Sequence, residues 1–201
     1  VQGDAWARSG QWEEKGNYPL TKSVRNRTVG ILGLGRIGQT IAEMATMFDA
    51  NVIYHTRSKK DVPYTYYDDL TEMAQAADVL IVITPGGAAT QHLGNADVMI
   101  ALGPEGILVN VARGSFVDEP ALIEALQDGR LGGAGLDVFE SEQHIPAALK
   151  ALDNVVLAPH IGSATVETRD GMGALVCENL DSWLAHGKIK ACVPECQHLN
   201  T

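Results

Sequence analysis

An arginine, two carboxylates and a histidine lie at or just beyond the ends of apolar stretches in this chain. Arg113 belongs to NVARG, Asp137 lies in LDVFESE with Glu142 a few residues beyond it, and His160 belongs to APHIGSAT. If these side chains meet in one crevice, they could reduce a 2-keto acid. The arginine would bind the substrate carboxylate and polarise its carbonyl, and the histidine would donate a proton to the developing alkoxide. Taken singly, three of them have an equally good structural explanation: Arg113 as a cap of a carbonyl, Glu142 as a solvated loop acid and His160 as a hydrogen-bonded structural residue.

A glycine-rich stretch, GLGRIG at 33–38, could bind the phosphates of a dinucleotide. It lies between an apolar stretch and a segment with helical spacing of apolar residues, the context that such a loop requires. Gly33 permits a tight turn, Gly35 lets the backbone approach a pyrophosphate, and Gly38 lets a helix pack closely on a strand. The amides of Arg36 and Ile37 open the helix, where the helix dipole favours an anion. An ordinary glycine-rich turn is the alternative interpretation.

The segment YHTRSKK at 54–60 indicates which dinucleotide binds. An acidic residue about 20 residues after the glycine loop usually binds the ribose hydroxyls. Thr56 and Arg57 stand in its place, followed by Ser58 and two lysines. A guanidinium can pair bidentately with a 2′-phosphate, and the hydroxyls add donors. The segment therefore predicts NADP(H) rather than NAD(H), although NAD is still possible and a solvated basic loop is the alternative.

Alternating strands and helices are expected to position these residues. Helical spacing at 36–48 predicts one apolar stripe of Ile37, Ile41, Ala45 and Phe48, and helices are also predicted at 119–129 and 163–186. The last of these is expected to turn its apolar residues inward. Six apolar stretches predict strands: 28–35, 51–55, 78–85, 106–112, 134–139 and 154–159. This order predicts an α/β fold with a doubly wound parallel sheet of the Rossmann type, in which ligands bind beyond the carboxyl ends of the strands.

Four segments in order, GLGRIG, NVARG, GAGLDVFESE and PHIGSATVETR, closely resemble the D-2-hydroxyacid dehydrogenase family. The likeness extends from about residue 4 to about residue 195. It implies that Arg113, Glu142 and His160 are catalytic and that Asp137 holds the nicotinamide carboxamide. It also implies further cofactor contacts, with His160 itself among them: Val111 and Gly162 in the nicotinamide pocket, Thr84 and Pro85 on the adenosine side, and Thr90 near the pyrophosphate.

Within that family, YHTRSKK and ITPGG at 83–87 are most similar to NADP-preferring glyoxylate and hydroxypyruvate reductases and to 2-ketogluconate reductases. The resemblance therefore implies glyoxylate, hydroxypyruvate or a similar small 2-keto acid as the substrate. One residue departs from the pattern: Gln143 follows the expected catalytic acid, where the family usually has proline.

The resemblance also implies an organisation in segments. Residues 1–27 would form an arm that helps to make a homodimer, and 28–187 the dinucleotide-binding domain. Residues 188–201 would lead back to a substrate domain that this chain lacks. The alternative function is a non-catalytic NAD(P)-binding dimerisation module, similar to the corepressors that share the fold. The complete set of Arg113, Glu142 and His160 favours the enzyme.

Composition limits the remaining possibilities. A chain of 201 residues with 45% apolar residues suits one sizeable globular domain with additional arms. Its formal net charge of −10 argues against binding to nucleic acid or to an anionic membrane. No apolar run approaches the roughly 20 residues of a membrane span. Three cysteines without tight paired spacing favour the cytoplasm and predict no metal site.

Overall fold

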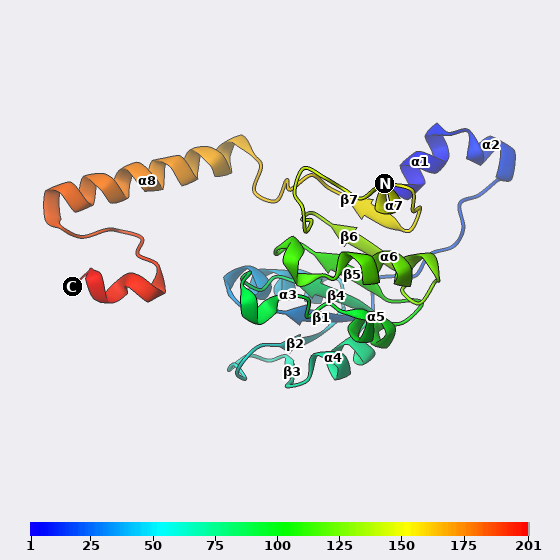
Figure 1. Ribbon diagram of the computed structural model, residues 1–201, viewed down its shortest axis with the longest axis horizontal. Helices are drawn as coiled ribbons and strands as arrows, with labels where there is room; N and C mark the ends of the chain where they lie inside the picture. Colours follow the sequence, from blue (N-terminus) through cyan, green and yellow to red (C-terminus); the bar gives the residue numbers. More distant parts are fainter. Residues whose placement is uncertain (201) are drawn as a thin grey trace. The chain divides into compact units, whose positions relative to one another are not determined.

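The computed structural model describes the backbone of residues 1–200 and the side chains of all of these except 194, 195 and 199. Thr201, the last residue of the expected C-terminal segment, lies outside the described residues. The chain divides into two compact units, Val1–Pro159 and a second unit that begins at His160. Figure 1 colours both along the chain, from blue to red.

Within the described residues, seven parallel strands form one sheet in the first unit (Figure 1). Their spatial order is β3-β2-β1-β4-β5-β6-β7, so the direction of winding reverses between β1 and β4. In open α/β sheets this reversal marks the crevice where ligands bind. The expected α/β fold is confirmed, with these strands: β1 (Thr28–Leu32), β2 (Asn51–His55), β3 (Thr65–Tyr67), β4 (Val79–Val82), β5 (Ile107–Asn110), β6 (Gly133–Leu136) and β7 (Val155–Leu157).

One strand more than expected is present, because β3 joins the sheet at its edge beside β2. It has three residues and follows a segment rich in turns. A run this short carries no measurable alternation of apolar and polar residues, so the sequence pattern does not predict it.

Helices cover both faces of the sheet. Residues of α4, α5 and α6 join one large core cluster, while α3 packs on the other face against β1 and β2. The starts of α4, α5 and α6 are capped by Asp69, Asn95 and Asp118, whose side chains each accept a hydrogen bond from the backbone N–H three residues on. The helices of this unit beyond the arm are α3 (Arg36–Met47), α4 (Leu70–Ala76), α5 (Ala96–Leu102), α6 (Glu119–Gln127) and α7 (Ala147–Lys150), with 3-10 turns η1 (Ala88–Thr90) and η2 (Gly114–Phe116).

The apolar stripe expected on α3 is partly wrong. Ile37 is 62% exposed and Phe48 is 64% exposed, whereas Gly38 and Ala42 are the buried residues of this helix. The helix lies so close to the sheet at Gly38 that its small residues face inward, which turns Ile37 toward solvent. Helical spacing identified the helix correctly, but the backbone contact at Gly38 decides which side is buried.

The N-terminal arm contains two short helices, α1 (Gln2–Arg8) and α2 (Gln11–Lys15), and neither buries a residue. Trp6 packs edge to face against Tyr18 with ring centroids 5.5 Å apart, and its indole N–H donates to the Gly16 carbonyl at 3.2 Å. These contacts lie within the arm and give it local order.

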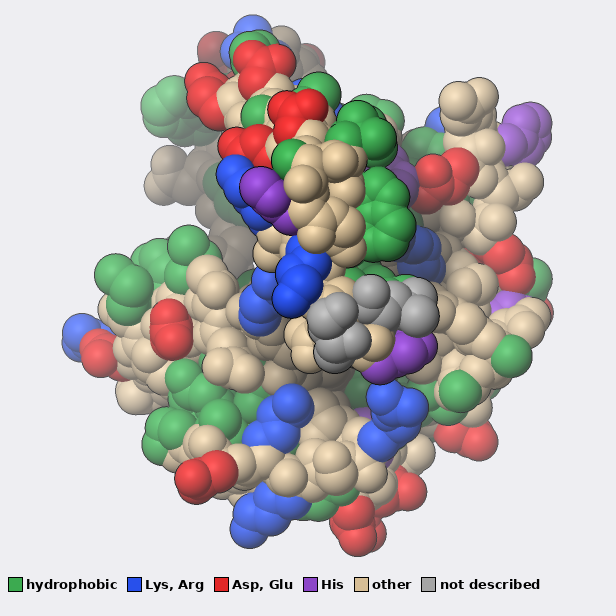
Figure 2. All heavy atoms as spheres, turned by 90° about the vertical axis from the view of Figure 1, so that its left-hand side faces the viewer, with side chains coloured by type: hydrophobic (Ala, Val, Ile, Leu, Met, Phe, Trp, Pro, Cys, Tyr) green, Lys and Arg blue, Asp and Glu red, His purple; other side chains and the backbone are tan. Residues whose placement is uncertain are grey.

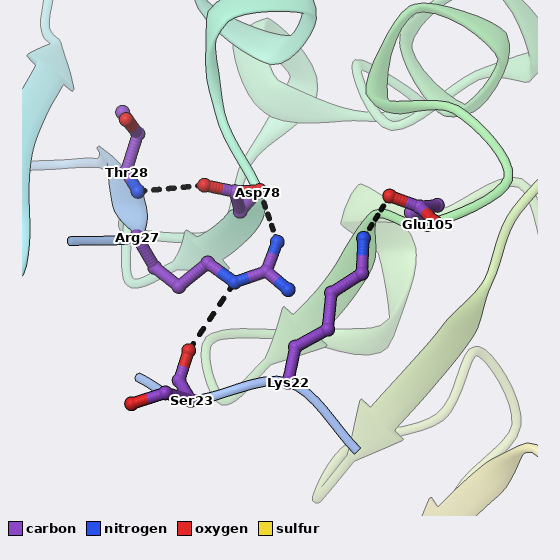
Figure 3. A network of polar contacts seen from close by, with 6 residues as sticks. All are labelled: Lys22, Ser23, Arg27, Thr28, Asp78 and Glu105. Carbon is purple, nitrogen blue, oxygen red and sulfur yellow. Dashed lines mark hydrogen bonds and ion pairs between the residues drawn. The ribbon is translucent and has the colours of Figure 1, made fainter. Parts of the chain in front are cut away.

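Charged side chains join the end of the arm to the start of the sheet (Figure 3). Asp78 accepts hydrogen bonds from the backbone N–H of Thr28, at 2.8 Å, and from the Arg27 guanidinium. Lys22 pairs with Glu105 beside them. Burial raises the pKa of Asp78, but the Thr28 hydrogen bond and the Arg27 charge outweigh it. The pKa therefore lies below the ordinary value of 3.8.

The second unit contains the long helix α8 (Val166–His186) and the 3-10 segment η3 (Pro194–Leu199). Thr165 caps the start of α8 by accepting from the Thr168 N–H at 3.2 Å, and Gly187 ends the helix with φ 67°. The expectation that its apolar residues face inward is wrong, because α8 buries no residue and Leu184 is 83% exposed. Apolar side chains are visible at the surface in Figure 2. Helical spacing defines an apolar face without showing what covers it.

Among the described helices, none combines the length and the apolar character that a membrane-spanning helix requires.

Candidate functional site

The carboxyl ends of the strands lie in one row across the sheet. Leu32 of β1 is in register with His55 of β2 and Val82 of β4, and the row continues through Asn110 and Leu136. Because all strands are parallel, the residues that follow them lie at one edge. The structure therefore brings these predicted site residues of the first unit to that edge: Gly33, Thr56, Thr84, Val111, Arg113 and Asp137.

The glycine loop is the tightest part of this edge. Gly33 has φ 98°, a conformation that favours glycine, and its N–H donates to the His55 carbonyl at 3.0 Å. A Cβ atom at Gly33 would lie 2.8 Å from the carbonyl oxygen of Ile83. At Gly38 a Cβ atom would collide with the carbonyl oxygen of Gly33. These two glycines thus allow β1, β4 and α3 to meet.

The start of α3 is open to a ligand. Gly35 is its N-cap in an extended conformation and, having no side chain, provides no capping acceptor. The space where its Cβ would stand is empty, and Arg36 and Ile37, the first helical residues, are exposed. Backbone N–H groups in the first turn of a helix have no partner within the helix, and they favour an anion. The loop therefore suits the pyrophosphate of a dinucleotide.

The segment after β2 presents cations. The side chains of Arg57, Ser58, Lys59 and Lys60 are all exposed, and Thr56 is half-buried. In the described part of the chain, no carboxylate lies within ion-pair distance of the three cations. Their charge is thus available to an anionic group that binds beside β2, as a 2′-phosphate would.

The loop that carries Arg113 is shaped by Asn110, which is 1% exposed. The side-chain NH₂ group of Asn110 donates to the Arg113 carbonyl at 2.9 Å, and its side-chain oxygen accepts from the Ala112 backbone N–H at 3.1 Å. The stem of Arg113 lies against Gly86, where a Cβ atom would come within 2.8 Å of its Cγ. Asn110 was not predicted as a site residue, although a polar residue at the end of an otherwise apolar strand was a signal for it.

Three more contacts brace the same loop from its flanks. The His92 imidazole lies 2.8 Å from a carboxylate oxygen of Glu140, and the backbone N–H of His92 donates to the Ser115 carbonyl at 2.9 Å. The Glu140 N–H in turn donates to the buried Glu119 carboxylate at 2.7 Å. Segments that follow β4 and β6 are thereby joined across the segment that follows β5. His92, Glu119 and Glu140 were not predicted, because only the fold brings them together.

Other predicted residues of this unit lie in the same loops. Asp137 is buried and its N–H donates to the Asn110 carbonyl at 3.1 Å. The Thr90 hydroxyl donates within its own loop, to the carbonyls of Pro85 and Gly87, each at 3.1 Å. Glu142 is exposed in the segment that follows β6.

His160 and Gly162 belong to the second unit, where both are exposed. The backbone of His160 has φ 53°, in the left-handed region that side chains seldom adopt. Their roles toward a cofactor or substrate stay predictions.

The three cysteines are free thiols. Among the described residues, no group of three or more His, Cys, Asp or Glu side chains is placed to hold a metal ion.

Comparison with known proteins finds relatives in one class of enzyme, the 2-hydroxyacid dehydrogenases and related reductases. Residues 1–162 match the family model described as D-isomer specific 2-hydroxyacid dehydrogenase, NAD binding domain. A hydroxyphenylpyruvate reductase of Plectranthus scutellarioides is 50% identical over 180 residues, which cover 89% of this chain and 57% of that protein. A glyoxylate/hydroxypyruvate reductase A of Arabidopsis thaliana is 49% identical over 180 residues, with the same coverage. The chain thus spans 57% of the length of each of these two curated relatives.

Solved structures agree with the fold. The NADPH-dependent glyoxylate/hydroxypyruvate reductase of Sinorhizobium meliloti, in complex with NADP and malonate, superposes with a TM-score of 0.91 at 49% identity. The match covers 96% of this chain and 61% of that one. A D-isomer specific 2-hydroxyacid dehydrogenase of Lactobacillus delbrueckii ssp. bulgaricus, in its NAD complexed form, has a TM-score of 0.86 at 27% identity. That match covers 96% of this chain and 64% of the other.

Proposed function

Because the chain belongs to the D-isomer specific 2-hydroxyacid dehydrogenase family, we propose that it is the coenzyme-binding part of an NADP(H)-dependent 2-keto acid reductase. Glyoxylate, hydroxypyruvate or a similar small 2-keto acid is the proposed substrate, in line with the names of its relatives. The chain covers a little over half of those relatives, so the complete reaction also requires what the rest of such a protein provides.

The observation that carries the cofactor proposal is the segment after β2. Where a ribose-binding acid is usual, the chain has Thr56 and Arg57. The side chains of Arg57, Lys59 and Lys60 are exposed, and among the described residues no carboxylate forms an ion pair with them. A 2′-phosphate would gain charge-assisted hydrogen bonds there, whereas an unphosphorylated ribose would gain few. The S. meliloti relative, which is NADPH-dependent, supports the same choice.

For the chemical step we propose the roles that the sequence motifs indicate. When bound, the reduced nicotinamide supplies a hydride to the substrate carbonyl carbon. Arg113 binds the substrate carboxylate and polarises the carbonyl, and His160 donates the proton that the new alkoxide requires. Glu142 orients His160 by accepting a hydrogen bond from its other ring nitrogen. Asp137 holds the nicotinamide carboxamide, with Val111 and Gly162 in the same pocket.

The proposed organisation keeps the boundaries expected from the sequence, with an arm at 1–27, a dinucleotide-binding domain at 28–187 and a connecting segment at 188–201. We propose that the chain forms a homodimer through this arm, in which Trp12 is exposed.

We also propose a cytoplasmic location, which the three free cysteines support.

Calorimetric titration of the chain with NADPH and NADH tests the cofactor proposal. The expected preference for NADPH is about tenfold or more, the contribution of one good charge-assisted pair. Arg57→Asp is expected to erase or invert that preference, because it removes the guanidinium and restores the acid. Lys150→Asp, which makes the same charge change at an exposed site on α7, should leave it unchanged. Equal affinity of the unchanged chain for both cofactors would contradict the proposal.

A further inference from the structure

Two tyrosine hydroxyls hold the ends of the cationic segment, residues 56–60. Tyr54 is 0% exposed, and its hydroxyl accepts a hydrogen bond from the Lys60 N–H at 2.8 Å and donates to the Lys60 carbonyl at 3.1 Å. The Tyr66 hydroxyl donates to the Thr56 carbonyl at 3.1 Å. The first and last residues of the segment are therefore each bonded, through the backbone, to a tyrosine.

Both tyrosines are anchored in the sheet. Tyr54 of β2 and Tyr66 of β3 are partners in register, and their ring centroids lie 5.4 Å apart. Tyr54 belongs to the buried cluster beneath α3, and Tyr66 packs against that cluster. Rings packed on neighbouring strands have little freedom to move, so their hydroxyls are fixed points.

The segment is also bonded internally. The Thr56 hydroxyl donates to the Ser58 carbonyl at 2.7 Å, which folds the chain back around Arg57. The Val62 N–H donates to the Lys60 carbonyl at 3.1 Å, the same oxygen that accepts from Tyr54. These bonds give a shape to a segment whose three cations repel one another and whose side chains are exposed at residues 57–60.

We propose that Tyr54 and Tyr66 are specificity-determining positioning residues, whose hydroxyls hold residues 56–60 in the shape that receives a 2′-phosphate. The inference rests on the proposed preference for NADP(H). A segment ordered before binding loses less conformational entropy when the phosphate arrives, so its affinity is higher. NADH has no 2′-phosphate and makes no use of that order. The hydroxyls therefore discriminate between the cofactors without touching either one.

The test is calorimetry on the 201-residue chain and on Tyr54→Phe, Tyr66→Phe and the double variant, each titrated with NADPH and with NADH. Phenylalanine keeps the ring packing and removes the hydroxyl. Tyr66→Phe removes one hydrogen bond and is expected to weaken NADPH binding about fivefold, the usual effect of such a loss. Tyr54→Phe removes two and is expected to weaken NADPH binding at least as much, with NADH affinity changed less than about twofold in both variants. Tyr64→Phe is the matched control, because the half-buried Tyr64 lies in the same region and its hydroxyl bonds no described residue.

A second titration uses fragments of the cofactor. Adenosine 2′-monophosphate should lose affinity in the two variants, and adenosine 5′-monophosphate should not. Thermal unfolding reports whether each variant folds. If Tyr54→Phe does not, the half-buried Tyr66 carries the test.

The possible outcomes separate this inference from the proposed function. If the unchanged chain binds NADPH and NADH equally, the cofactor proposal fails and this inference fails with it. If the unchanged chain prefers NADPH and both phenylalanine variants keep the full preference, this inference alone is overturned. A variant that folds and binds both cofactors more weakly by the same factor also overturns it, because the hydroxyl then supports the fold without affecting the choice of cofactor.

Discussion

Asp78 shows how one charge can connect two parts of the chain. It follows α4 and immediately precedes β4, yet its carboxylate bonds Arg27 and Thr28, where the arm enters β1. Thr28 begins the strand that carries the glycine loop at its other end, so the contact fixes the start of that strand. The nearby Lys22–Glu105 pair is more exposed, with the Glu105 side chain 72% accessible (Figure 3). Exposed pairs contribute little to stability.

Replacing Asp78 should therefore have an effect that replacing Glu105 does not. Asp78→Asn is expected to lower the free energy of unfolding by about 1–2 kcal/mol at neutral pH, because a charged acceptor of two hydrogen bonds is lost. Glu105→Gln is the matched control, and its effect should stay below about 0.5 kcal/mol. Urea unfolding of the three proteins measures both values. Equal effects of the two substitutions would contradict this assignment.

The same contact should weaken in acid. The folded-state pKa of Asp78 lies below its ordinary value of 3.8, so its stabilisation is complete above that value. It is lost as the pH falls through the folded-state pKa, because the carboxylate is then protonated in both states. The difference in stability between the unchanged chain and Asp78→Asn should accordingly shrink below about pH 4. A difference of constant size from neutral pH down to about pH 3 would show that the Asp78 charge is not its source.

The junction of β1 and α3 has two functions, close packing of a helix on a strand and room for a ligand. Gly38 faces the Gly33 carbonyl so closely that a methyl group does not fit, whereas the space beside Gly35 is open. Both glycines belong to the same motif, but the structure gives them different tasks. Gly38 serves the contact between helix and strand, and Gly35 leaves room for a ligand at the helix start.

Two alanine substitutions should separate these tasks. Gly38→Ala is expected to destabilise the fold by about 2–3 kcal/mol, because the helix must move away from the strand. Gly35→Ala should lower the free energy of unfolding by less than about 1 kcal/mol, the difference between glycine and alanine at an N-cap. It should nevertheless weaken NADPH binding, because the added methyl group occupies the open space at the helix start. Thermal unfolding and cofactor titration measure the two effects. Normal cofactor affinity in Gly35→Ala would contradict the proposed pyrophosphate site.

The sequence predicted the elements with strong patterns and missed those fixed by contacts between distant residues. The alternation of apolar stretches and helices predicted the sheet, and GLGRIG predicted the tight turn at Gly33. By contrast, β3 is too short for a pattern, and the buried face of α3 depends on a backbone contact at Gly38. Local patterns show which residues are apolar, but the surface that covers them lies elsewhere in the chain.

In the candidate site, too, residues with a local sequence signal could be predicted and contacts between distant residues could not. Thr56, Arg57 and Arg113 could be predicted because each follows a predicted strand. The bond of His92 to Glu140 could not be predicted, because it joins two loops 48 residues apart. Asn110 bonds only within its own loop, so the polar residue at the end of an apolar strand was a local signal that could have identified it. Tyr54 was predicted only as part of a strand and Tyr66 was assigned no role, since nothing in their spacing shows that their hydroxyls bond the cationic segment.

We expect this chain to bind the cofactor without efficient turnover of a substrate. The glycine loop, the cationic segment and Asp137 all lie in the first unit, so most of the proposed dinucleotide site is present there. The relatives named above are longer, and the chain spans 57% of each curated one. Reductases of this kind depend on excluding water and on holding the hydride donor and acceptor at near-attack distance. Those tasks require surfaces on both sides of the substrate.

We therefore expect the 201-residue chain to bind NADPH. Its rate of glyoxylate or hydroxypyruvate reduction should be lower than that of a full-length relative by a factor of about a thousand or more, because the reacting groups are no longer positioned. NADPH oxidation at saturating keto acid, measured beside the Arabidopsis reductase, provides the comparison. Joining the chain to the remaining part of that reductase should restore activity, and the same fusion with Arg113→Ala should not. Turnover by the unfused chain at the rate of the relative would contradict the expectation. It would mean that the residues of this chain complete the substrate site by themselves or across a dimer.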